Sequence, residues 1–225
     1  MESREQKSKN RNLFKDRKRT NILKESEQKL ILYLVKKVPG WMSPNMLTGI
    51  GIAGSVLIFL AFVLAYYVDT TFLLLGPLGF FINWFGDSLD GRIAYFRKIP
   101  RKWYGFSLDI IMDWIGTVII GLGYFLYADS DYKIVAFILV ALYGWAMIIS
   151  QLRYKISNVY AIDAGIVGPT EIRVIISVII LIELIFPHTI HYFISAICVI
   201  LLLINIKDTN ALLDLGDLRD LEEKQ

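Results

Sequence analysis

The sequence contains one cysteine, Cys198, and two histidines, His188 and His191. A single cysteine excludes an intramolecular disulfide. The histidines lie in the 187–191 link between two apolar segments, where we expect no metal-binding role. The sequence therefore lacks the cluster of Cys and His that zinc sites usually use. A long apolar run is also missing before Leu47, so we expect no signal peptide.

Charge is unevenly distributed along the chain. Residues 1–40 contain twelve Lys or Arg against five acids, whereas residues 208–225 contain six acids against two bases. We expect residues 1–26 to form a basic cytoplasmic arm and residues 208–225 an acidic cytoplasmic tail. The intervening 27–40 segment mixes lysines with an apolar stripe, which predicts an amphipathic juxtamembrane helix on an anionic lipid surface. We expect membrane lipids as partners of this chain and no nucleic acid.

Apolar residues dominate the remainder of the chain. The hydrophobic share is 55% and the mean hydropathy is +0.51, which is more apolar than a typical soluble domain. A transmembrane helix needs about 20 predominantly apolar residues. Six segments meet this need, at residues 46–68, 72–96, 105–128, 133–152, 168–187 and 189–206. The sequence thus predicts an all-α fold, a six-transmembrane-helix bundle in one membrane domain over residues 41–207.

The basic residues of the links predict the orientation of this bundle. The 92–104 link holds five Lys or Arg, and it lies on the same side as the basic arm. Because cytoplasmic links are enriched in Lys and Arg, both termini are expected in the cytoplasm. The membrane expected is the cytoplasmic membrane of a bacterium or an archaeon.

Four aspartates interrupt two of the predicted membrane segments. Asp87 and Asp90 are three residues apart, and Asp109 and Asp113 are four apart, so each pair lies on one face of its helix. Four carboxylates in a site of low dielectric constant repel one another unless a cation lies between them. Oxygen ligands suit hard cations such as Mg²⁺ or Mn²⁺, and two such ions can clamp a phosphoryl transfer.

The stretch from Asp87 to Asp113 resembles the signature of the CDP-alcohol phosphatidyltransferases, Asp-x2-Asp-Gly-x2-Ala-Arg-x8-Gly-x3-Asp-x3-Asp. Seven of its eight fixed positions agree, at Asp87, Asp90, Gly91, Ala94, Gly105, Asp109 and Asp113. The family Arg is replaced by Tyr95, and ten residues rather than nine separate Ala94 from Gly105. Arg92 and Arg97 are the candidates to supply the missing positive charge.

The resemblance implies a metal-dependent enzyme that transfers a phosphate-linked group from a CDP-linked lipid donor to an alcohol and releases CMP. It implies that Asp87, Asp90, Asp109 and Asp113 bind two divalent cations, and that Asp113 also accepts the hydroxyl proton. It implies nucleotide contacts at Gly91, Ala94 and Gly105, and at Asn45 and Thr48 of a Pro-Asn-x-x-Thr entry. Enzymes of this family are commonly homodimers, so the resemblance implies a homodimer here.

The acceptor is less constrained by the sequence than the metal site. Arg153, Lys155 and Arg173 lie on the predicted cytoplasmic side and favour a small polar acceptor with its own phosphate, such as inositol phosphate or glycerol phosphate. The donor is then CDP-diacylglycerol. Transfer of a head group from CDP-choline or CDP-ethanolamine to a lipid alcohol is an alternative. A divalent-cation transporter is an alternative of another class, because intramembrane carboxylates also mark ion pathways.

Overall fold

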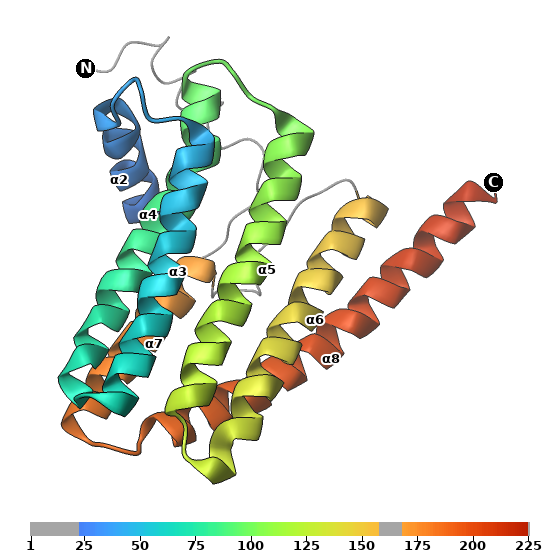
Figure 1. Cartoon of the computed structure of the whole chain (residues 1–225). Helices are drawn as coiled ribbons and strands as arrows, with labels where there is room; N and C mark the ends of the chain where they lie inside the picture. The colour runs from blue at the N-terminus through green and yellow to red at the C-terminus, as the bar shows by residue number, and fades with distance from the viewer. Residues whose placement is uncertain (1–22, 158–167, 225) are drawn as a thin grey trace.

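The computed structural model describes residues 23–157 and 168–224, and within this part of the chain the structure is entirely helical. The long helices follow one another as an up-and-down bundle (Figure 1). They are α2 (Lys24–Lys37), α3 (Pro44–Tyr67), α4 (Leu75–Phe96), α5 (Lys102–Tyr127), α6 (Lys133–Ser157), α7 (Pro169–Ile185) and α8 (Ile190–Glu223). Two short 3₁₀ helices, η1 (Thr70–Leu74) and η2 (Ser130–Tyr132), lead into α4 and α6.

The all-α prediction is confirmed, but the count of six spans is not. Among residues 23–157 and 168–224, five helical segments are long and apolar enough to cross a membrane: Pro44–Tyr67, Thr70–Phe96, Lys102–Tyr127, Ser130–Ser157 and Ile190–Glu223. The predicted fifth span corresponds to α7, which has 17 residues. At a rise of about 1.5 Å per residue, α7 is about 25 Å long, shorter than the roughly 30 Å of a hydrocarbon core. A sixth crossing therefore stays a prediction.

Helix α2 packs on the bundle through the apolar stripe that the sequence predicted. Its residues Ile31 and Val35 are buried in a cluster with Trp84, Leu89 and Ile93 of α4. A protein surface thus covers part of the stripe that we had assigned to lipid. Residues 1–22 of the predicted basic arm lie outside the described residues, and the binding of α2 to a membrane stays a prediction.

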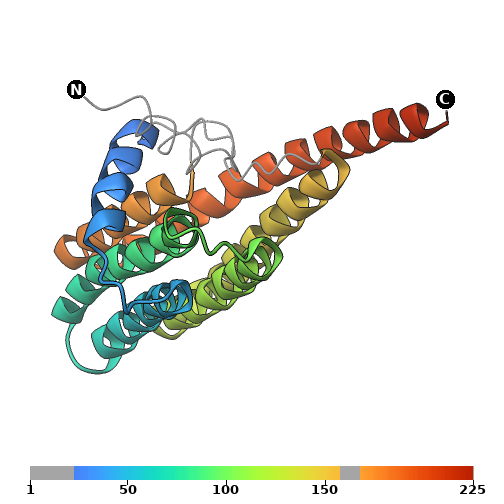
Figure 2. The same ribbon diagram turned by 90° about the horizontal axis from the view of Figure 1, so that it is seen from above.

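Helix α8 is longer than predicted. It continues to Glu223 instead of ending near residue 206, so the segment predicted as an acidic tail is helical. Arg153 of α6 lies 3.6 Å from Asp208 of α8, and Arg219 donates to the carbonyl oxygens of Lys155 and Ile156. These contacts hold the end of α6 against α8, whose last turns extend beyond the other helices (Figure 2).

Glycines bring the backbones of α3 and α4 into direct contact. A Cβ atom at Gly54 of α3 would lie 2.6 Å from the carbonyl oxygen of Gly79, and one at Gly79 would lie 2.9 Å from that of Gly54. Two turns further along α4, a Cβ at Gly86 would collide with the backbone of Gly51. Asn83 crosses this seam and donates to Gly51 O at 3.0 Å. The seam fixes the position of α4 relative to α3.

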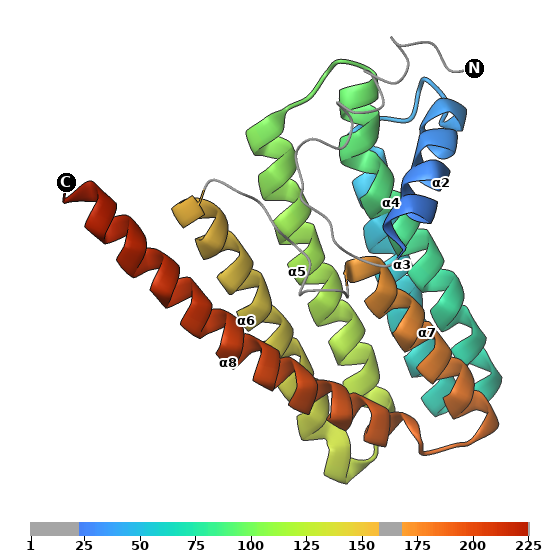
Figure 3. The same cartoon turned by 180° about the vertical axis from the view of Figure 1, so that it is seen from behind.

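Small residues in the second half of α5 also bring this helix close to α3. A Cβ at Gly116 would lie 2.8 Å from Ser55 Oγ, and one at Gly123 would lie 2.9 Å from Phe59 Cα. Seen from behind, α7 lies beside α4 on one side of α5, whereas α6 and α8 lie on the other (Figure 3). The first half of α5 faces α4 across the region that contains the aspartates.

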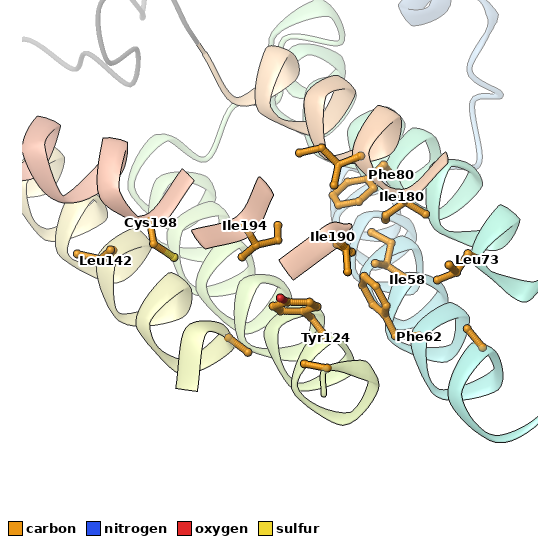
Figure 4. Packing of buried hydrophobic residues seen from close by; sticks show 14 residues of the cluster. Ile58, Phe62, Leu73, Phe80, Tyr124, Leu142, Ile180, Ile190, Ile194 and Cys198 are labelled. Atoms are coloured by element: carbon orange, nitrogen blue, oxygen red, sulfur yellow. The ribbon is translucent and has the colours of Figure 1, made fainter. Parts of the chain in front are cut away.

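The larger apolar core lies in the half of the bundle away from the aspartates. It joins Ile58, Phe62, Tyr124, Ile180 and Ile194 from four different helices (Figure 4). Many apolar side chains elsewhere on the helices remain exposed, as expected for surfaces that face lipid; Phe137 is 66% and Leu203 63% exposed. The apolar core and the aspartates thus lie toward opposite ends of the bundle.

Candidate active site

Three of the four aspartates meet between α4 and α5. Asp87, Asp109 and Asp113 each offer one carboxylate oxygen, and these oxygens lie within 4.8 Å of one another. All three side chains are half-buried. Helix α4 presents Asp87 because the glycine seam holds it against α3, and α5 presents Asp109 and Asp113 on successive turns of one face. The fold therefore brings together three of the four acids that the sequence analysis placed in one site.

Asp90 is held one turn away from this trio. Thr48 Oγ1 of α3 donates to Asp90 Oδ2 at 2.6 Å. Thr48, Asp90 and Asp109 line two adjoining cavities, one small and one large. The small cavity measures about 20 Å³ and also includes Asp87 and Asp113 in its wall. A space of this size accepts one water-sized particle, which suits a small cation bound by oxygen ligands.

A cation from a third helix already contacts the acids. Arg173 of α7 donates through Nη2 to Asp87 Oδ2 at 2.6 Å, and the side chains of this pair are 15% and 21% exposed. If the four carboxylates are ionised, Arg173 supplies one positive charge against four negative ones. The remaining excess of negative charge in a half-buried site favours the binding of divalent cations. The donor set thus fits hard metal ions.

The large cavity, of about 370 Å³, opens beside the acids at the end of the bundle where α4 finishes and α5 begins. Gly91, Ala94 and Gly105 are part of its wall, and their contact with a nucleotide stays a prediction. A Cβ atom added at Gly91 or at Gly105 would meet nothing within 4 Å. These two glycines therefore do not serve helix packing, unlike Gly54 and Gly79 of the seam, and they leave space beside the helix backbones.

The wall of the large cavity also contains two cations that the sequence analysis did not single out, Arg101 and Lys102. Arg101 Nη2 donates to Asn45 Oδ1 at 2.8 Å, and its guanidinium carbon lies 3.9 Å from the centre of the Tyr104 ring. Asn45 in turn donates to Tyr104 Oη at 3.2 Å. Asn45 and Thr48, one turn apart on α3, thus both line the cavity.

Neither of the two arginines considered as substitutes for the family Arg lines the large cavity. Arg97 donates to the carbonyl oxygens of Met42 and Pro39, so it fastens the α2–α3 link. Arg92 is buried at 6% exposure in α4. Tyr95 lines the cavity near Arg101 in the same wall. Arg101 is therefore the better candidate to supply the missing positive charge. In the sequence, the one sign of this role is that Arg101 directly precedes the segment that forms α5.

The three predicted acceptor residues do not lie together. Arg173 contacts the acids directly. Arg153 faces α8 and lies 3.6 Å from Asp208, and Lys155 is exposed at the end of α6. Tyr154, between them in sequence, lines the large cavity. The acceptor role of all three residues remains a prediction, and geometry favours Arg173.

A family model described as CDP-alcohol phosphatidyltransferase matches residues 41–205, which are 165 of the 225 residues of the chain. The matched range begins just before α3 and ends within α8, and it includes the four aspartates and the walls of both cavities. No curated protein matches the chain.

Proposed function

The chain belongs to the CDP-alcohol phosphatidyltransferase family, and on that premise we propose that it transfers a phosphatidyl group from CDP-diacylglycerol to a small polar alcohol that carries its own phosphate. Inositol phosphate and glycerol phosphate are the favoured acceptors. The family is a transferase family of the EC 2.7.8 type, acts in phospholipid biosynthesis and generally depends on divalent cations. The protein is an integral membrane enzyme.

One observation carries the proposal. The ion-sized cavity among the acids adjoins the larger cavity that contains Arg101 and Lys102, and Thr48, Asp90 and Asp109 belong to both walls. A CDP-linked donor has two features that match this pair of cavities, a diphosphate that needs cations and a nucleoside that needs room. Placing the diphosphate at the acids puts the cytidine among Asn45, Tyr104 and the open backbone at Gly91.

The residues would divide the reaction as follows. The acceptor hydroxyl gives its proton to the Asp113 carboxylate while its oxygen forms a bond to the phosphorus that carries the diacylglycerol. The bond from that phosphorus to the bridging oxygen breaks, and CMP leaves with the bridging oxygen. Mg²⁺ or Mn²⁺ ions held by Asp87, Asp90, Asp109 and Asp113 would stabilise the negative charge that develops on the diphosphate. Arg101 orients the diphosphate from the cavity side.

The preference for a phosphorylated acceptor depends on Arg173. Its guanidinium reaches the acids from α7, whereas Arg101 belongs to the wall of the large cavity. A planar guanidinium binds phosphate oxygens in pairs, so Arg173 can exchange Asp87 for the phosphate of an incoming acceptor. The acceptor hydroxyl is then held close to Asp113.

The test is CMP release by the purified protein in liposomes with Mg²⁺ or Mn²⁺. CDP-diacylglycerol is supplied with inositol phosphate, inositol, glycerol phosphate or glycerol, so that each phosphorylated acceptor has an unphosphorylated partner. We expect metal-dependent CMP release with one phosphorylated acceptor and none in Asp113→Asn. The matched control is Asp131→Asn, which removes the same charge from an exposed residue at the opposite end of the bundle.

Other results would select the alternatives. CMP release from CDP-choline or CDP-ethanolamine with diacylglycerol, and none from CDP-diacylglycerol, would replace the proposed donor and keep the family reaction. Passage of Mg²⁺ or Mn²⁺ into proteoliposomes without any CDP-linked substrate, lost in Asp113→Asn, would favour a transporter.

A further inference from the structure

A second group of metal-ligating side chains lies at the end of the bundle opposite the aspartate site. It consists of Asp129, in the link after α5, and His188 and His191, around the start of α8. One ligand atom of each lies within 4.8 Å of the other two. The fold joins these side chains across about sixty residues of sequence, which is why the sequence analysis expected no metal there.

The spacing of the ligand atoms suits a transition metal. His188 Nδ1 lies 3.0 Å and His191 Nε2 3.2 Å from the same oxygen, Asp129 Oδ2. Ligand atoms about 2.0 Å from a tetrahedral Zn²⁺ ion are about 3.3 Å apart, so small shifts would admit the ion. Two imidazoles and one carboxylate form a ligand set that zinc accepts and that Mg²⁺ does not prefer.

His191 is held in the orientation that a ligand needs. It is 2% exposed, and its ring stacks on Tyr132 with centroids 4.7 Å apart and an interplanar angle of 9°. Its Nδ1 lies 3.1 Å from the hydroxyl of Tyr124, whose position at the base of the bundle is visible in Figure 4. A partner on one ring nitrogen fixes the other nitrogen, Nε2, toward Asp129, as outer-shell groups do for metal-binding histidines.

The link that carries His188 is also fixed from within. Glu183 is buried, and its carboxylate accepts the backbone N–H groups of His188, Thr189 and Ile190 at 2.8–2.9 Å. His188 has a φ of 69°, in the left-handed region that non-glycine residues rarely adopt. Glu183 holds the backbone in this conformation, and the result is that His188 Nδ1 points at Asp129.

We propose that Asp129, His188 and His191 bind Zn²⁺ in a site separate from the catalytic cations. The side chains of Asp129 and His188 are 52% and 75% exposed, so the ion can enter from solvent and water can complete its coordination. The bound ion joins the α5–α6 link to the α7–α8 link and thereby ties the end of α5 to α8.

The experiment uses the full chain purified in detergent, with excess Mg²⁺ present to occupy the carboxylate site. Co²⁺ is titrated first, because nitrogen ligands in a low-coordinate site give visible absorption bands that an all-oxygen site does not give at comparable strength. Zn²⁺ is then added to displace Co²⁺, and the unfolding temperature is measured with and without Zn²⁺. We expect one equivalent bound with a Kd below about 10 μM and a higher unfolding temperature.

Substitutions test whether Asp129 and His188 are the residues that bind Zn²⁺. Asp129→Asn and His188→Ala change exposed side chains, so neither leaves a void in the core, and each should weaken Zn²⁺ binding about tenfold or more and abolish the Co²⁺ bands. Asp131→Asn, which removes the same charge two residues from Asp129, should bind as the unchanged protein does. Asp113→Asn should also retain Zn²⁺ binding, which separates this site from the proposed catalytic one. Unaltered binding in both ligand variants, or no binding near this Kd in the unchanged protein, overturns the proposal.

Discussion

Two glycines of α4 lead to opposite predictions, because Gly79 packs against α3 whereas Gly91 faces open space. Gly91→Leu places a side chain in the large cavity and meets nothing in the fold within 4 Å of its Cβ. Leucine is a better helix former than glycine by up to about 1 kcal/mol, so stability should stay the same or rise. Binding of the CDP-linked donor should weaken, because the side chain fills space beside the helix.

The expected size of each effect follows from the contacts. For Gly91→Leu we expect KM for the CDP-linked donor to rise about tenfold or more, which corresponds to about 1.4 kcal/mol. For Gly79→Ala, a Cβ atom 2.6 Å from Ile58 Cγ1 and 2.9 Å from Gly54 O forces the two helices apart. Overpacking of this kind costs about 1–3 kcal/mol of unfolding free energy.

The assay combines CMP release over a range of donor concentrations with thermal unfolding in the same detergent. Gly91→Leu should keep its unfolding temperature and lose donor affinity, and Gly79→Ala should lose stability. If Gly91→Leu binds the donor as well as the unchanged protein does, the nucleotide does not lie along this face of α4. If Gly91→Leu unfolds at a lower temperature than the unchanged protein, the space beside Gly91 is needed for packing.

Four further substitutions test other parts of the structure. Thr48→Val removes the hydroxyl that donates to Asp90 without changing volume; kcat should fall about tenfold, and the Mg²⁺ concentration needed for half-maximal rate should rise. Arg101→Gln should raise KM for the CDP-linked donor about tenfold or more, whereas Arg97→Gln should change stability and not KM, a comparison made by steady-state kinetics and thermal unfolding. Glu183→Gln replaces a carboxylate that accepts three backbone N–H groups with an amide that has one acceptor oxygen. The substitution should lower the free energy of unfolding by about 1–3 kcal/mol, measured by denaturant unfolding in detergent micelles.

The spacing of the aspartates along the sequence was enough to predict which of them share a helix face. Asp87 and Asp90 share a face because they are three residues apart on a helix, and Asp109 and Asp113 because they are four apart. The apolar segments likewise gave the positions of the helices, since a membrane span must satisfy its backbone internally and is long and apolar. The convergence of the two pairs depended on α4 and α5 being neighbours, which the short link between them favours.

Long-range contacts could not be predicted in the same way. The sequence gives no sign that Arg173 meets Asp87, because 86 residues separate them. Arg97 was a reasonable substitute for the family Arg, but its place just after α4 turns it toward the α2–α3 link. Arg101 reaches the cavity because the link after α4 bends back before α5 begins. Each of these outcomes depends on the path of a link, and periodicity carries no information about that path.

The role of Glu183 could not be predicted from the sequence either. Glu183 is buried near the end of α7 and accepts the hydroxyl of Tyr127 at 2.7 Å. An acid in this position compensates the free N–H groups where α8 begins, a requirement that arises only once the helix boundary is known.

The glycine seam has a mechanical consequence for the reaction. Because α3 and α4 touch backbone to backbone, Thr48, Asp87 and Asp90 are held at fixed positions relative to one another. Helix α5 is joined to α3 on both sides of its acids, through Gly116 and Gly123 after Asp113 and through Tyr104, which accepts from Asn45, before Asp109. A substitution that widens the seam would therefore displace Asp87 and Asp90 relative to Asp109 and Asp113, whose helix is joined to α3 independently.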